Sequence, residues 1–191
     1  MAWLPYVAPE GETVQQRTAL DEVRAERGAV SLFSRTLAHS PAGLRTYEDL
    51  SRHVRLASPL APALRELVIL RIAQHFGNEY EWRRHTRAAL ALGIAQERLA
   101  ALAGWRDAGD AFDARERAAL GWVDGFLGGD HRPPPAAMEA LTAAFTPEEV
   151  VELALLAGLY VTVAAVMVPL GLSEDDEAAP APLPMTLVSD I

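Results

Sequence analysis

The sequence of 191 residues contains no cysteine. This absence excludes disulfides, thiolate nucleophiles, thiol peroxidase chemistry and metal sites with cysteine ligands. The sequence also lacks a basic excess, because 26 Asp and Glu residues outnumber 17 Lys and Arg residues and the formal net charge is −9. A nucleic acid needs a basic stripe on its protein partner, so we expect no nucleic-acid ligand.

The first residues lack the features of a secretory signal. They contain neither a basic segment nor a following apolar segment, so we expect a cytoplasmic protein. Ala and Leu dominate the composition, whereas β-branched residues cluster only near the end of the chain. This composition favours an all-α fold, and the length suits one domain with a sizeable core.

Proline, glycine and capping residues divide the chain into a helical body with two irregular ends. We predict a single all-helical domain over residues 1–172, in which residues 1–12 form an extended arm. Residues 173–191 are acidic and rich in Pro and Ala, which predicts a mobile tail. The helices are predicted at 13–27, 30–39, 41–57, 61–75, 79–92, 96–103, 114–128, 136–145 and 147–168, with a polar surface loop at 104–110.

The last helical segment is long enough to span a bilayer, since no charged residue occurs from Leu153 to Leu172. However, acidic residues flank it at both ends, and no Lys or Arg lies within it or after it. Ala, Gly and Thr also dilute its apolarity. We therefore interpret it as a buried core or subunit-interface helix and expect no membrane partner.

Residues 64–93 carry the candidate site, as two helices separated by a break at Gly77. Glu66 lies on the first helix among apolar residues, and His85 lies on the second. Taken alone, Glu66 is better explained as a first-turn acid or as a partner for a neighbouring arginine. If the two helices pack antiparallel, a buried carboxylate needs a partner and His85 is the obvious candidate. We therefore predict a Glu66–His85 proton-transfer pair.

Glu81 has two explanations between which the sequence does not decide. It lies four residues before His85 and so shares its helix face, where a carboxylate can orient an imidazole. It also lies three residues after Asn78, which is the spacing of a capping box. For Asn78 itself, capping is the favoured interpretation. Two ligands at this spacing are weak support for a metal site, and we predict neither a metal nor a cofactor.

Four further residues are candidates for contact with a substrate. Arg71 and Arg83 are expected to hold a carboxylate, although arginines at helical spacing also form solvated faces. Tyr80 and Trp82 are expected in the core or in a pocket wall that touches the substrate. The sequence contains no phosphate-binding glycine loop, nucleophile elbow or dinucleotide fingerprint.

The segments ELVILRIA from Glu66, EYEWRRH ending at His85, and ALALGI around Gly93 together resemble the carboxymuconolactone decarboxylase family, which includes AhpD-type alkylhydroperoxidases. The resemblance implies an AhpD-like helical bundle and a homo-oligomer, as a trimer, hexamer or dimer. In the peroxidase branch, the motif places a Glu at Glu66, a His at His85 and two cysteines at Asn78 and Glu81. This chain departs from that branch at both cysteine positions.

The resemblance therefore implies the decarboxylase branch, which acts on small carboxylated lactones without a redox cysteine pair. We expect a cofactor-free lyase or isomerase that acts on a small, anionic organic molecule. His85 would be the general acid and base, Glu66 would orient it and Glu81 would assist. The alternative is a non-catalytic helical oligomer that binds a ligand or a protein. A cysteine-free peroxidase, or a metal-dependent enzyme using Glu66, Glu81 and His85, is less favoured.

Overall fold

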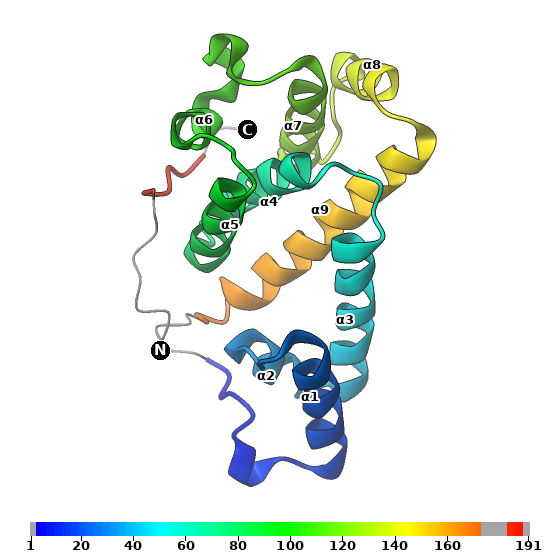
Figure 1. Cartoon of the computed structure of the whole chain (residues 1–191), viewed down its shortest axis with the longest axis vertical. Helices are drawn as coiled ribbons and strands as arrows, with labels where there is room; N and C mark the ends of the chain where they lie inside the picture. The colour runs from blue at the N-terminus through cyan, green and yellow to red at the C-terminus, as the bar shows by residue number, and fades with distance from the viewer. Residues whose placement is uncertain (1–2, 173–182, 189–191) are drawn as a thin grey trace. The chain divides into compact units, whose positions relative to one another are not determined.

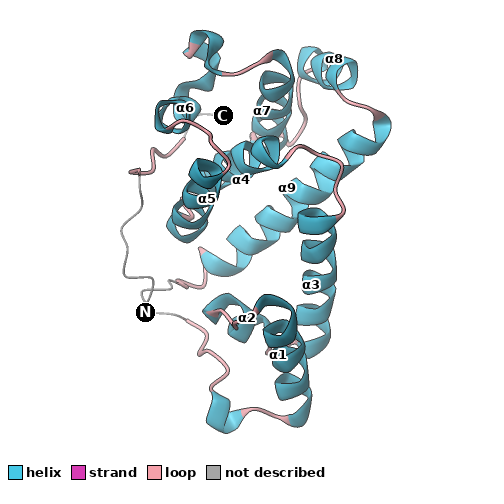
Figure 2. Ribbon diagram, viewed as in Figure 1, coloured by secondary structure: helices cyan, strands magenta, loops and turns pink. Residues whose placement is uncertain are grey.

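The computed structural model describes residues 3–172 and 183–188. Every regular element in these residues is helical (Figure 2), as the composition predicts. The α-helices are α1 Val14–Arg27, α2 Leu32–Leu37, α3 Pro41–Leu56, α4 Pro62–Phe76, α5 Glu79–Ala91, α6 Gln96–Ala101, α7 Ala114–Leu127, α8 Pro135–Ala144 and α9 Pro147–Met167 (Figure 1). Three short 3₁₀ helices are η1 Pro9–Gly11, η2 Leu102–Asp107 and η3 Gly109–Ala111.

The described residues group into two compact units. The first contains residues 3–58 and 165–172, and the second contains residues 59–164 and 183–188. Helix α9 begins in the second unit and ends in the first. The prediction of one domain over residues 1–172 stays a prediction.

The first unit is built from α1, α2 and α3. Thr13 and Gln16 form a capping box at the start of α1, and Gly28 ends the helix with a φ of 79°, as the sequence predicts. Apolar residues of α1 and α3 meet in a small core that includes Leu20, Val23 and Leu44. These contacts explain why the amphipathic helices pack together.

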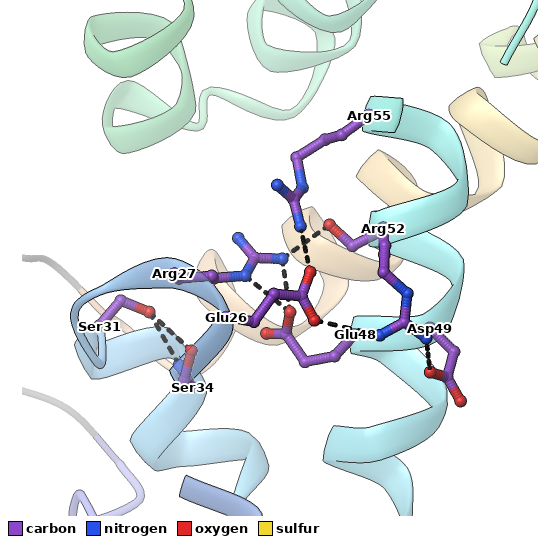
Figure 3. Close-up of polar contacts among 9 residues, drawn as sticks. Glu26, Arg27, Ser31, Ser34, Glu48, Asp49, Arg52 and Arg55 are labelled. Carbon is purple, nitrogen blue, oxygen red and sulfur yellow. Dashed lines mark hydrogen bonds and ion pairs between the residues drawn. The ribbon is translucent and has the colours of Figure 1, made fainter. Parts of the chain in front are cut away.

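Ion pairs connect the polar edges of α1 and α3 (Figure 3). Arg27 donates from Nε to Glu48 at 2.7 Å and from Nη2 to the Ser51 hydroxyl at 2.8 Å. Arg52 and Arg55 both bind the carboxylate of Glu26, at 3.1 and 2.7 Å. The more exposed of these pairs contribute little individually, but together they fix the register of the two helices.

The N-terminal arm is extended and packs within the first unit. Val7 is buried, and its carbonyl accepts a hydrogen bond from Arg35 at 2.8 Å. Trp3 is exposed, although its N–H donates to the carbonyl of Leu170 at 2.9 Å. Within the described residues the arm has no regular structure before the short helix η1, and its prediction over residues 1–12 stays a prediction.

The second unit is organised around α4, which packs against α5 and α7. Residues on all sides of α4 are buried, among them Leu67, Val68, Ile69 and Leu70. The polar edge expected of a surface helix is therefore almost absent. Gly77 ends α4 with a φ of 64°, a left-handed conformation that suits glycine. The reversal of the chain at this glycine places α5 beside α4 (Figure 1).

The segment 104–110 is not the polar surface loop that we predict from its composition. It lies within the short helices η2 and η3, and Trp105 is buried in the same core cluster as Leu67 and Trp82. The Trp105 Nε1–H donates to Asp124 on α7 at 2.9 Å. A buried tryptophan with its indole N–H satisfied holds this connector against the unit.

Part of the predicted mobile tail is packed rather than free. In the described stretch 183–188, Leu183 is buried and belongs to the same core as Trp82. The Trp82 Nε1–H donates to the Leu183 carbonyl at 2.9 Å. The other residues of the predicted tail, 173–182 and 189–191, lie outside the described residues.

Helix α9 begins as the sequence predicts and supplies much of the core. The Glu149 N–H donates to the Thr146 hydroxyl at 3.3 Å, and the Thr146 N–H donates to the Glu149 carboxylate at 2.9 Å. Within the described part of the chain, α9 alone is long and apolar enough to cross a bilayer, a property that core helices share. Leu153, Leu156 and Leu159 are buried in the protein, which supports the interpretation as a core helix.

Two glycines of α7 provide a matched test of how α7 packs against Pro133 and Trp105. A Cβ at Gly125 would lie 2.5 Å from Cα of Pro133, whereas a Cβ at Gly121 would make an ordinary contact of 3.6 Å with Trp105. Gly125→Ala should therefore lower the free energy of unfolding by about 1–3 kcal/mol. Gly121→Ala should raise it by about 0.5–1 kcal/mol through helix propensity. Urea denaturation measures both, and equal shifts in the same direction would contradict the packing described.

Candidate active site

Glu66 and His85 meet across the α4–α5 pair, as the sequence predicts. Oε2 of Glu66 lies 2.7 Å from Nδ1 of His85. The His85 residue is buried, and the Glu66 side chain retains 15% of its exposed area. This hydrogen bond orients the imidazole ring and fixes Nδ1 as the nitrogen that faces Glu66.

Glu81 points to the imidazole and does not complete a capping box. Its Oε2 lies 3.0 Å from Nε2 of His85. The Asn78 side chain accepts from the Glu81 N–H at 3.2 Å, so that Asn78 caps α5 as expected. The Asn78 N–H donates to the Ala73 carbonyl at 2.9 Å. Of the two explanations for Glu81, contact with the imidazole is therefore the one found.

Tyr160 on α9 is a member of the cluster that the sequence analysis misses. Its hydroxyl lies 3.1 Å from Nε2 of His85, and the two rings meet edge to face with centroids 5.0 Å apart. Tyr160 is 75 residues from His85 in the chain, and no local spacing connects them. We call Glu66, Glu81, His85 and Tyr160 the His85 cluster.

The His85 cluster favours a charged imidazole. Burial lowers the pKa of His85, but the hydrogen bonds with Glu66 and Glu81 and the charges of these two carboxylates outweigh burial. The net effect raises the pKa of His85 from 6.5 to about 9. At neutral pH the ring therefore carries both protons, with Nδ1–H directed to Glu66 and Nε2–H directed to Glu81 and the Tyr160 hydroxyl. The arrangement can supply a proton from Nε2.

Arg71 does not hold a substrate, which corrects the prediction from the sequence. The residue is 1% exposed, and its guanidinium donates to Asp124 from Nε at 2.6 Å and from Nη2 at 3.0 Å. Its Nη1 donates to the carbonyls of Leu102 and Ala103, each at 3.3 Å. Arg71 is consequently a structural cation that connects α4, η2 and α7.

Trp82 is also a structural residue, because it is 2% exposed and its indole N–H is bonded to Leu183. It forms the core and not a surface that a substrate touches. Tyr80 is buried, and its hydroxyl accepts a hydrogen bond from Arg84 at 3.1 Å. Its predicted contact with substrate stays a prediction, as does that of Arg83, which is half-buried.

Arg84 is the arginine that the structure places in the electrostatic environment of the His85 cluster. Burial lowers the pKa of Arg84, but the negative charges of Tyr80, Glu81 and Tyr160 when ionised, and the bond to Tyr80, raise it overall. Arg84 therefore stays charged at every accessible pH. Its electrostatic interactions with Glu81 and Tyr160 make Arg84 a candidate for binding a substrate carboxylate.

The described residues contain no group of three or more His, Asp and Glu side chains arranged to hold a metal ion. Glu66, Glu81 and His85 are instead bonded to one another. An imidazole with hydrogen bonds at both nitrogens has no lone pair directed at a metal. The arrangement of these three side chains suits proton transfer.

Comparisons with known proteins agree with this helical fold. Residues 41–125, which include Glu66, Glu81 and His85, match the sequence model described as the carboxymuconolactone decarboxylase family. No curated protein sequence matches the chain.

Three solved structures share the fold. One is a protein of unknown function from Agrobacterium tumefaciens, described as a candidate antioxidant defence protein AhpD. It is 24% identical, has a TM-score of 0.67, and the match covers 74% of this chain and 96% of that chain. The debrominase Bmp8 in complex with 2,3,4-tribromopyrrole has 11% identity, a TM-score of 0.75 and coverage of 92% and 95%. A peroxidase-related protein from Ralstonia eutropha, with an AhpD core, has 20% identity, a TM-score of 0.71 and coverage of 92% and 93%. The fold is thus AhpD-like, as the resemblance implies.

The structural role of Arg71 is testable by its effect on stability. Arg71→Gln should lower the free energy of unfolding by about 3 kcal/mol, because it breaks a buried charge pair and leaves the carbonyls of Leu102 and Ala103 without their donor. Arg83 is half-buried on the neighbouring helix α5. Arg83→Gln should change the free energy of unfolding by less than about 0.5 kcal/mol. Urea denaturation of both variants is the measurement. Wild-type stability of Arg71→Gln would restore Arg71 as a candidate for substrate binding.

The raised pKa of His85 predicts how stability depends on pH. Because the folded value of about 9 exceeds the ordinary 6.5, the contribution is complete below pH 6.5 and disappears as pH rises through 9. At about 1.4 kcal/mol for each pKa unit, the loss amounts to a few kcal/mol. Chemical denaturation from pH 6.5 to above pH 9 should show this fall in the free energy of unfolding in wild type, and a smaller fall in Glu81→Gln. Stability that increases with pH over this range would contradict the charged cluster.

Proposed function

Residues 41–125 place this part of the chain in the carboxymuconolactone decarboxylase family, and from that premise we propose that the protein is a cofactor-free acid–base enzyme. It acts on a small carboxylated organic molecule or lactone. The single observation that supports the proposal is the imidazole of His85 held between Glu66 at 2.7 Å and Glu81 at 3.0 Å. A buried imidazole with this environment is typical of a group tuned for proton transfer.

Decarboxylation fits the charge state of the cluster better than isomerisation does. When the bond between the substrate's carboxylate and the carbon that bears it breaks, carbon dioxide leaves and the electron pair is delocalised into the lactone carbonyl conjugated with that carbon, as an enolate. The Nε2–H of His85 then donates a proton to that carbon, and solvent returns a proton to the ring. Isomerisation requires a base first, and the charged imidazole is not one.

The remaining groups of the cluster have distinct roles in this proposal. Glu66 keeps the ring orientation through Nδ1, and Glu81 and Tyr160 hold the Nε2–H in place until the carbanion forms. Arg84 binds the substrate's second carboxylate or its lactone carbonyl, in the role first assigned to Arg71. The carboxylates also keep the proton on His85 before the substrate binds.

The compartment and the assembly state are part of the proposal. We place the protein in the cytoplasm as a homo-oligomer. Support for the homo-oligomer comes from exposed apolar side chains on the last helix, where Val151 is 59% exposed and Leu155 is 37% exposed. A second copy would remove such side chains from water.

The proposal is tested by turnover of a panel of carboxylated lactones, followed by carbon dioxide release. His85→Gln should lower kcat by about 10²–10⁴-fold, because the proton donor is lost. Glu66→Gln and Tyr160→Phe should retain folding and lower kcat by roughly tenfold or more. Glu79→Gln is the matched control, since Glu79 is an exposed acid in the first turn of the same helix.

Two results would overturn the proposal. One is an unchanged kcat in His85→Gln, and the other is an absence of turnover in wild type for every lactone. In the second case, retained binding of a lactone by wild type would support the alternative of a non-catalytic binding protein. Circular dichroism of each variant separates loss of chemistry from loss of fold.

A further inference from the structure

A cavity lies apart from the His85 cluster, within the second unit. It has a volume of about 630 Å³ and lies between η2, α7 and α8. No residue of the His85 cluster lines it. The volume is within the range of small-molecule sites in proteins, about 300–1,000 Å³. We call it the α7–α8 cleft.

The α7–α8 cleft exists because small residues face each other across it. Ala114 and Ala118 lie on the α7 side, and Ala137 and Ala140 lie on the α8 side, while Gly125 lets Pro133 approach α7 closely at the edge of the lining. Leu141, one residue further along α8, is fully buried and does not line the cleft. Helices that pack to fill space bring large side chains to such positions. Here the apolar lining leaves room for a guest of moderate size.

The floor of the cleft carries positive charge. Asp124 is fully buried, and its carboxylate already binds Arg71 in two hydrogen bonds. Arg106 adds a second guanidinium to the same carboxylate, with Nη1 at 2.5 Å from Oδ2. Two guanidinium groups therefore share one carboxylate, and the side chain of Arg106 remains 56% exposed. A second anion would complete the pairing.

Further arginines line the cleft. Arg117 donates from its guanidinium to the carbonyls of Phe112, Arg106 and Gly109. None of these partners is a carboxylate, so none of them neutralises the charge of Arg117. Arg132 is exposed at the cleft, and within the described residues its side chain has no ion-pair partner. Asp124 and Asp130 are the acids in the lining. Three arginines against two aspartates make the cleft cationic in a chain of net charge −9.

We propose that the α7–α8 cleft binds a small organic anion, with the anionic group at Arg106 and Arg132 and an apolar body against the Ala and Gly lining. Charge complementarity selects an anion, and the lining selects an apolar body over a bare inorganic ion. The site is distinct from the His85 cluster, so the proposal does not depend on the proposed decarboxylase activity.

The test uses 4-fluorobenzoate as the probe and fluorine NMR of the full-length protein as the readout. Two companion probes separate the parts of the proposal: 4-fluorobenzamide has the same body without charge, and inorganic phosphate has charge without the body. We expect saturable binding of 4-fluorobenzoate. The affinity of 4-fluorobenzamide, and that of phosphate measured by competition with the benzoate, should each be lower by roughly tenfold or more.

Matched variants locate the binding. Ala140→Leu fills the cleft from an exposed position of α8, whereas Ala143→Leu adds the same side chain at an exposed position of that helix outside the lining. Arg132→Gln removes a lining charge, whereas Arg24→Gln removes a charge in the first unit. Ala140→Leu and Arg132→Gln should each weaken benzoate binding by roughly tenfold, and the two controls should not change it.

Three outcomes would overturn the proposal. These are no saturable benzoate binding, equal binding of the amide, and binding that Ala140→Leu leaves intact. Sedimentation velocity adds one more measurement with the same variants. If Ala140→Leu alone reduces the size of the assembly, a second copy of the chain occupies the cleft and the small-anion proposal fails.

Discussion

The hydrogen bond between Glu66 and His85 depends on the close pairing of α4 with α5, and the rest of the candidate site depends on that bond. Gly77 permits the left-handed turn that reverses the chain, and Asn78 caps the helix that follows. Because α4 is buried on nearly all sides, it provides a fixed support for α5. The imidazole therefore meets Glu66 at one nitrogen and Glu81 at the other without a long loop to position it.

Local chemistry made the helices predictable, and long-range packing made other features unpredictable. The cap at Thr13 and the left-handed glycines are short-range signals, and they place helix ends correctly. Segment 104–110 contains Gly104 and charged residues that suggest a loop, yet Trp105 folds it into the core. The sequence indicates no partner for the Trp105 indole, because Asp124 lies on another helix.

The candidate site shows the same division. Glu66 and His85 were predictable from their resemblance to a family motif, and that segment matches the family. Tyr160 was not predictable, since only the tertiary fold brings α9 to Nε2. Arg71 was misassigned, although its surroundings held a usable signal. An arginine on a helix that is apolar all round must be buried, and a buried guanidinium requires a carboxylate inside the fold.

The absence of cysteine gains a physical explanation from the residues at the two positions where the resemblance places a thiol pair. Asn78 caps α5, and Glu81 presents a fixed negative charge to Nε2 of His85. A neutral thiol there could give its proton to a neutral imidazole, which is the base in that step. A carboxylate does the reverse and holds the proton on the ring, in agreement with the raised pKa of His85. Exchange of a thiol for a carboxylate thus converts a proton acceptor into a proton donor within one helical framework. Such a change suits a reaction that ends in protonation of carbon.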